Sequence, residues 1–111
     1  MKITLGEIII VNELHEAKSF FTRLKGLLFK KSISEDEGML ISPCSQIHTF
    51  GMKFPIDVIF LSGDFTVLEV LKNIFPNKIS RYIPESKYVL ELAAGAAEKN
   101  SISKGQNLVL R

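Results

Sequence analysis

The stretch Ile56-Asp57-Val58-Ile59-Phe60-Leu61 decides the fold of this chain of 111 residues. After Asp57 it is apolar at every position, which is typical of a central strand that is covered on both faces. The turn-forming residues Ser62-Gly63-Asp64 follow it directly. The next apolar stretch, residues 65–74, is therefore expected to form a second, long strand joined to the first by a tight turn.

Outward from this centre, further short apolar runs predict the remaining strands. They occupy residues 2–5, 7–11, 39–41, 88–92 and 107–110. Between residues 15 and 28 the apolar positions recur at spacings of three and four, which predicts one short amphipathic helix in the N-terminal half. The small residues at 93–98 are compatible with a second helical turn. We expect a mainly β (α+β) single domain, a small antiparallel barrel or sandwich of about seven strands.

Composition bounds the function classes. With 46% hydrophobic and 23% charged residues, the chain has enough apolar material for one core. A net charge of +2 is not the basic footprint of a nucleic-acid binder, and no apolar run approaches the roughly 20 residues that span a bilayer. A single cysteine, Cys44, allows no intramolecular disulfide and fits a reducing compartment. We expect a cytoplasmic protein that binds neither nucleic acid nor membrane.

Residues 43–57 form the most distinctive segment, because they place a thiol, an imidazole, an amine and a carboxylate within 15 residues. The thiol of Cys44 and the imidazole of His48 suggest a nucleophile and its base. Four residues of straight strand span about 13 Å, however, whereas such a pair must lie about 3 Å apart. Extended geometry would place Cys44, Gln46, His48, Phe50 and Met52 on one face and Ser45, Ile47, Thr49 and Gly51 on the other. We therefore expect Cys44 to be a small, buried apolar residue and not a nucleophile.

His48 is the stronger functional candidate, since an imidazole titrates near neutral pH. Its neighbours Phe50 and Met52 are expected to desolvate it in part. The competing interpretation is a histidine that fastens its segment through a hydrogen bond. A metal site would need Cys44, Asp57 or Glu91 to converge on it, because His15 is the one other histidine and is expected on the helix. No ligand spacing of a known kind is present, so we expect no metal and no cofactor.

Asp57 and Glu91 each interrupt an apolar run. A buried carboxylate is costly unless it is paired or hydrogen-bonded. If the strands bring the two together, they form a general acid/base pair. If Arg23, Lys53 or His48 lies beside them, they belong to a structural ion network.

Several of these motifs together resemble a known family, the domain of unknown function 192. The resemblance runs from about residue 14 to residue 110. It implies a small, mainly β barrel or sandwich with a helix near the N-terminus, and it implies no reaction. The segments that carry it are Arg23-Leu24-Lys25-Gly26-Leu27-Leu28, Gly38-Met39-Leu40, residues 44–60, and Tyr88-Val89-Leu90-Glu91-Leu92 with Gly95 and Gly105.

Our leading hypothesis is a binding module for a small ligand or a protein partner, acting as a monomer or a weak dimer. Its predicted binding residues are Arg23, Cys44, His48, Lys53, Asp57 and Glu91. The alternative is a small enzyme in which His48 works with Asp57 or Glu91 in general acid/base chemistry. A third hypothesis is that these polar residues form a network that only holds the fold together.

Overall fold

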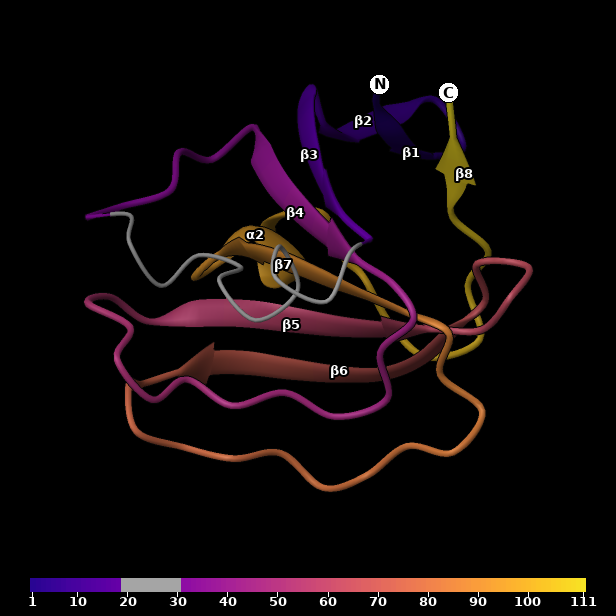
Figure 1. Cartoon of the computed structure of the whole chain (residues 1–111). Coiled ribbons are helices and arrows are strands. Elements are labelled where there is room, and N and C mark those ends of the chain that lie inside the picture. Colours follow the sequence, from indigo (N-terminus) through magenta and orange to yellow (C-terminus); the bar gives the residue numbers. More distant parts are fainter. Residues whose placement is uncertain (19–30) are drawn as a thin grey trace.

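The computed structural model describes residues 1–18 and 31–111, and Figure 1 shows how their strands are arranged. A three-stranded sheet has the order β2-β1-β8, and a five-stranded sheet has the order β3-β4-β7-β5-β6. A helix of four residues, α2, spans Ala96–Lys99. The strands are β1 (Ile3–Leu5), β2 (Ile8–Val11), β3 (Glu13–Ala17), β4 (Glu37–Ile41), β5 (Ile56–Leu61), β6 (Val67–Ile74), β7 (Tyr88–Ala93) and β8 (Val109–Leu110).

The predicted mainly β class is confirmed, and two details of the architecture are sharper than the prediction. Eight strands are present in the described residues, and their two sheets are open, so the term barrel does not apply. All strand pairs are antiparallel except β3 and β4, which run parallel. The expected helical turn at 93–98 is present as α2, shifted slightly toward the C-terminus.

The N-terminal helix was expected to begin at His15, and this start is wrong. Residues His15 to Ala17 belong to β3, where they pair with Met39 to Ile41 of β4. Tertiary pairing with a strand more than 20 residues away overrides the local helical spacing. The rest of the predicted helix, from residue 19 to residue 28, lies outside the described residues.

Strand β5 is the centre of the larger sheet, as its sequence predicts. All six of its residues are buried, and it pairs with β6 on one side and β7 on the other. The turn after it is fastened by the Thr66 amide, which donates to Ser62 Oγ at 3.1 Å, and by the Ser62 amide, which donates to the Thr66 carbonyl. The predicted return of the chain at Ser62-Gly63-Asp64 is therefore confirmed.

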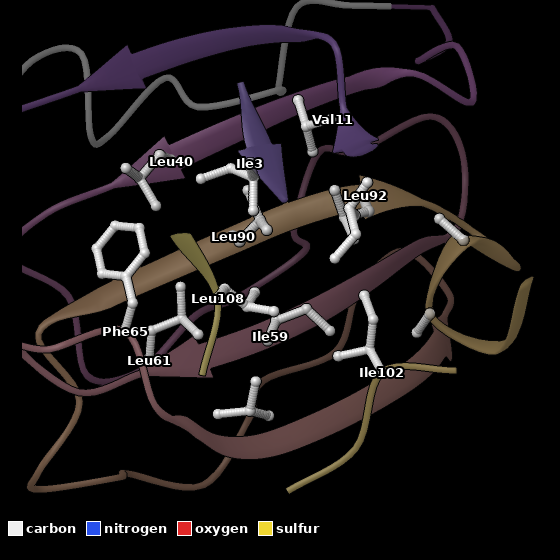
Figure 2. Close-up of a cluster of buried hydrophobic side chains, with 14 residues drawn as sticks. Ile3, Val11, Leu40, Ile59, Leu61, Phe65, Leu90, Leu92, Ile102 and Leu108 are labelled. Carbon is white, nitrogen blue, oxygen red and sulfur yellow. The ribbon is translucent and has the colours of Figure 1, made fainter. Parts of the chain in front are cut away.

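One face of the five-stranded sheet packs against the three-stranded sheet and α2, and this is the first core. Figure 2 shows Ile59, Leu61, Leu90 and Leu92 of the larger sheet beneath residues such as Ile3 of the smaller one. Gly38 of β4 is required at this interface, because a Cβ there would lie 2.9 Å from Val11 Cγ2. Close packing of the two sheets thus depends on a missing side chain.

The opposite face of the larger sheet carries a second core with a different cover. Its sheet residues include Met39, Val58, Phe60 and Val89. The side chains that cover them come from irregular segments and include Ile47, Met52 and Ile83. We call residues 42–55 and 75–86 the cover segments. The two faces therefore differ, since one is covered by regular structure and the other is partly covered by loops.

Candidate functional site

The distinctive segment of the sequence is one of these cover segments, and it runs beside the other along the β6 side of the sheet (Figure 1). The two meet as a short antiparallel ribbon in which His48 is opposite Ile79. The predicted alternation holds over its centre, where Ile47 and Thr49 are buried while His48 is exposed. It fails at Met52, which was expected on the His48 face and is buried.

Thr49 is the main clamp between the cover segments, and sequence reasoning did not single it out. Its hydroxyl donates to the Phe75 carbonyl at 2.8 Å and accepts from the Lys78 amide at 2.9 Å. Its own amide donates to the Lys78 carbonyl, and its carbonyl accepts from the Asn77 amide. The alternation of the segment could have identified it, because Thr49 lies on the same face as Ile47, and a polar side chain on a buried face needs hydrogen-bond partners.

Other polar side chains of the first cover segment also form hydrogen bonds with the second. Ser45 Oγ donates to the Ser86 carbonyl at 2.9 Å, and Gln46 Nε2 donates to the Ser80 carbonyl at 2.8 Å. In return, Ser80 Oγ accepts from the Ile47 amide, and Ser86 Oγ donates to the Cys44 carbonyl. These bonds hold the cover segments in one geometry.

Three predicted binding residues lie on the first cover segment but do not converge. Cys44 is half-buried and not buried as expected, because its Sγ lies at the edge of the cover, where it donates to the Gln46 carbonyl at 3.2 Å. His48 is exposed and stacks on Phe50 with ring centroids 5.5 Å apart. The expected desolvation of His48 by Met52 is wrong, since Met52 points into the core. Lys53 is exposed.

Asp57 is completely buried, and its carboxylate is occupied by backbone amides. Oδ1 accepts from the Asn73 amide at 2.8 Å, where the β5–β6 register shifts. Oδ2 accepts from the amides of Gly95 and Ala97 at 3.0 and 2.9 Å. Asp57 thus caps α2 from a different strand, in a place where the local N-cap, Gly95, has no side chain to do so.

Glu91 is buried in the opposite circumstances. It is 5% exposed, and its carboxyl has no hydrogen bond or ion pair with any described residue. Its partners across the sheet are Met39 of β4 and Val58 of β5, both apolar. Burial without compensation raises the pKa of Glu91 to about 7.

Asp57 and Glu91 do not form the general acid/base pair that the sequence left open, because they point to opposite faces of one sheet. Asp57 is opposite Leu92, a first-core residue, whereas Glu91 is opposite Val58, a second-core residue. Directly opposed residues share a face, so the two carboxyls are separated by the sheet. Neither forms a hydrogen bond with His48. Arg23, the remaining predicted site residue, lies outside the described residues.

The described residues instead form a groove between β6 and the cover segments, and sequence reasoning missed it. Its volume is about 270 Å³. Most of the wall is apolar, and the polar residues among those that line it are Asn73, Lys78 and Ser80. The lining residues are Ile47, Leu71, Asn73, Ile74, Phe75, Lys78, Ile79 and Ser80.

Large apolar side chains are also exposed on the same two segments. Phe50, Phe75, Ile79 and Tyr82 are each at least half exposed. The other exposed large apolar residues of the described chain belong to the three-stranded sheet or precede it. The groove therefore opens within one of two surface regions with exposed apolar side chains.

A separate polar cluster joins β3 and β4 at the far edge of the sheet. His15 Nε2 lies 3.1 Å from Glu37 Oε2 and 3.9 Å from Glu13 Oε1. These are the described side chains whose ligand-type atoms lie close enough together to hold a metal ion. Glu13 is exposed, and Glu37 also accepts from the amide and hydroxyl of Ser34, so the observed state is a surface hydrogen-bonded network. The prediction of His15 on a helix hid this cluster.

A family model matches almost the whole chain. The match covers residues 3–110, and the family is domain of unknown function 192, described as an uncharacterised ACR. The chain belongs to this family, as the resemblance of its motifs predicted. The chain is a small domain of mainly β structure. No curated protein matches it.

Two solved structures share the fold. A protein of unknown function from Novosphingobium aromaticivorans is 23% identical, with a TM-score of 0.86 over 98% of this chain and 82% of that one. A putative transcription regulator from Sinorhizobium meliloti is 26% identical, with a TM-score of 0.77 over 86% of this chain and 79% of that one. Among the described residues, no helix has the length and apolar character needed to cross a membrane.

Proposed function

We propose that this protein is a non-catalytic binding module that holds a small, mainly apolar ligand in the groove between β6 and the cover segments. The observation that carries the proposal is the groove itself, a hollow with apolar walls and a few polar groups. Small-molecule sites have this composition, in which apolar walls supply affinity and a few polar atoms fix orientation. The predicted binding function is kept, and the site moves away from His48, Asp57 and Glu91.

The hydrogen bonds around the groove support a preformed site. Thr49 fixes the backbone at Phe75 and Lys78, and Ser80 is fixed through Ile47 and Gln46. On the β6 side, the buried carboxylate of Asp57 holds the Asn73 amide. A wall that is already ordered loses little conformational entropy when a ligand binds.

The acid/base alternative receives less support from the same geometry. General acid/base partners act within hydrogen-bond reach or through one water. The carboxylate of Asp57 is occupied by three amides, and Glu91 lies beneath the second core, whereas His48 faces outward. The hypothesis of a purely structural network is supported for Asp57, which accepts hydrogen bonds from three backbone amides. That hypothesis gives no reason for the groove.

We place this function in the cytoplasm, because a single cysteine allows no intramolecular disulfide and fits a reducing compartment. We do not propose DNA binding for this chain, although the similar Sinorhizobium meliloti protein is described as a putative transcription regulator. A net charge of +2 supplies little of the basic surface on which DNA binding depends.

The test is a titration of the protein with 1-hexanol, followed through backbone amide chemical shifts. The volume of the groove equals that of about nine water molecules at about 30 Å³ each, so a hexyl chain fits. For so few atoms we expect a dissociation constant on the order of millimolar. Saturable shifts should be confined to residues 47 and 71–80.

A matched pair of variants locates the site. Ile79→Ser removes an apolar wall at a residue that is 64% exposed, and Ile9→Ser makes the same change at a residue of β2 that is 52% exposed. We expect Ile79→Ser to weaken 1-hexanol binding about fivefold and Ile9→Ser to leave it unchanged. Shifts that never saturate, or equal weakening in both variants, would contradict the proposal.

A further inference from the structure

The groove is lined by one charged residue, Lys78, and its positive charge indicates which class of ligand the groove would bind. Among its eight lining residues, Lys78 is the one charged side chain, and no carboxylate is present. The other cation of this stretch, Arg81, is already used, because its guanidinium donates to Glu69 Oε2 at 2.6 Å. The Lys78 ammonium forms no ion pair with any described carboxylate.

The position of Lys78 is fixed although its side chain is exposed. Its amide donates to Thr49 Oγ1 at 2.9 Å, and its carbonyl accepts from the Thr49 amide at 2.8 Å. The backbone of Lys78 is therefore fixed at the wall of the groove, and its exposed side chain carries the ammonium group. A second polar residue of the lining is Asn73, whose backbone amide is bound to Asp57 and whose side-chain amide makes no hydrogen bond with any described residue.

We propose that the natural ligand is a small amphipathic acid, whose apolar body fills the groove and whose carboxylate pairs with Lys78. This inference rests on the proposed function and adds the head group to it. The argument is charge complementarity, because an apolar hollow with one unpaired cation and no anion favours an anionic head group over a neutral or cationic one. The volume limits the ligand to about ten non-hydrogen atoms, by comparison with the space that water molecules occupy.

The experiment compares three probes that share one chain and differ in head group. They are hexanoate, 1-hexanol and hexylammonium, titrated at pH 7, where the acid is ionised and the amine protonated. We expect hexanoate to bind about fivefold more tightly than 1-hexanol, and hexylammonium to bind more weakly than either. Raising the ionic strength to about 1 M, where the Debye length is about 3 Å, should reduce the preference toward unity.

Variants of Lys78 assign the preference to one residue. Lys78→Met keeps an unbranched apolar stem and removes the charge, so the ratio of the 1-hexanol to the hexanoate dissociation constant should fall from about five to about one. Lys78→Glu should reverse the order, so that hexylammonium binds more tightly than hexanoate. Lys72→Met is the matched control, because Lys72 is exposed on β6, lies outside the groove lining, and its loss changes the net charge equally.

The outcomes separate the two proposals. If wild-type protein binds 1-hexanol in the groove but shows no preference for hexanoate, the head-group inference is overturned and the binding function stands. The head-group inference is likewise overturned if Lys78→Met keeps the preference, or if Lys72→Met loses it to the same degree. If no probe of the three produces saturable shifts at residues 71–80, the proposed function falls with the inference.

Discussion

Asp57 and Glu91 are two buried carboxyls on adjacent strands, one step apart in register, and they lie in opposite environments. Asp57 faces the first core, beneath regular structure, and accepts three backbone hydrogen bonds. Glu91 faces the second core, opposite Met39 and Val58, and accepts none from the described residues. Burial alone therefore does not decide the role of an acidic residue. The donors on the face to which it points decide it.

The difference extends to the two faces themselves. The first face is covered by a second sheet and by α2, whose N-terminus is held by Asp57. Part of the second face is covered by segments 42–55 and 75–86, which are held by side-chain hydrogen bonds such as those of Thr49. The groove opens on the loop-covered side, where irregular backbone leaves a hollow that a packed sheet would fill.

The largest effect is expected from removing the carboxylate of Asp57. Asp57→Ala leaves three backbone amides without an acceptor at buried or half-buried positions, and bonds from such amides to a charged acceptor contribute about 1.5–3 kcal/mol each. The free energy of unfolding should fall by about 4 kcal/mol or more, which is a large part of the total for a domain of this size. Urea unfolding monitored by circular dichroism measures it. A loss below about 1 kcal/mol would show that water replaces the carboxylate and would break the comparison.

The next largest effect is that of Glu91, whose ionised form destabilises the fold, so that its removal should stabilise the protein at high pH. Because the pKa of Glu91 rises from 4.5 to about 7 on folding, the folded protein holds a proton that the unfolded chain releases. The contribution of Glu91 is therefore fully favourable below pH 4.5 and is lost as pH rises through 7. The loss amounts to about 3 kcal/mol, at about 1.4 kcal/mol per unit of pKa.

The matched amide substitutions test this directly. Glu91→Gln removes the titration, so the variant should equal the wild type near pH 4.5 and be more stable by up to about 3 kcal/mol at pH 8. Asp57→Asn should be destabilising at both pH values. The side-chain amide of asparagine has one oxygen that accepts, whereas its nitrogen only donates, so it cannot replace both carboxylate oxygens as acceptors for the three backbone amides. Urea unfolding from pH 4 to pH 9 gives both curves. Parallel curves for wild type and Glu91→Gln would mean that Glu91 has a compensating partner.

A smaller loss is expected from loosening the loop cover. Thr49→Val keeps the shape of the side chain and removes its hydroxyl, so the Lys78 amide loses its acceptor. We expect a destabilisation of about 2 kcal/mol, the typical effect of leaving a buried donor unsatisfied. Hydrogen exchange should become faster at the Lys78 amide in particular. If exchange changes equally at the Asn100 amide at the end of α2, the two covers are one cooperative unit and the distinction between them fails.

The sequence was sufficient to single out Asp57 and Glu91, since each interrupts an apolar run in which an unpartnered carboxylate is costly. It was not sufficient to predict their faces. Whether Asp57 is opposite Leu92 or Glu91 depends on the β5–β7 register, which is set by contacts between strands about 30 residues apart. The mainly β class followed from local runs, whereas β3 was missed because its pairing with β4 is long-range.

The groove was beyond the sequence for a similar reason. Its walls come from β6, from Ile47 and from residues 75–80, which share no pattern along the chain. Exposed apolar residues such as Phe75 and Ile79, in a stretch bounded by Pro76 and Pro84, were the one available signal. Without a structure, such residues cannot be distinguished from core residues of a short strand.

The smallest expected effect concerns the exposed ion pair that ties the second cover segment to β6. The hydrogen bond from Arg81 holds the pKa of Glu69 below its usual value, so this pair is favourable above about pH 4.5 and is lost as pH falls further. Arg81→Gln should cost less than about 1 kcal/mol at pH 7, because Arg81 is mostly solvated, and the difference from wild type should shrink in acid. This trend is opposite to that of Glu91, whose contribution grows in acid. Unfolding at pH 3, 4.5 and 8 checks both trends. Arg81→Gln should be less stable than wild type at pH 8 and 4.5 and approach it at pH 3, whereas Glu91→Gln should be more stable than wild type at pH 8 and equal to it at pH 4.5. The reverse signs, a more stable Arg81→Gln and a less stable Glu91→Gln, would show that net charge and not these two environments determines the pH dependence.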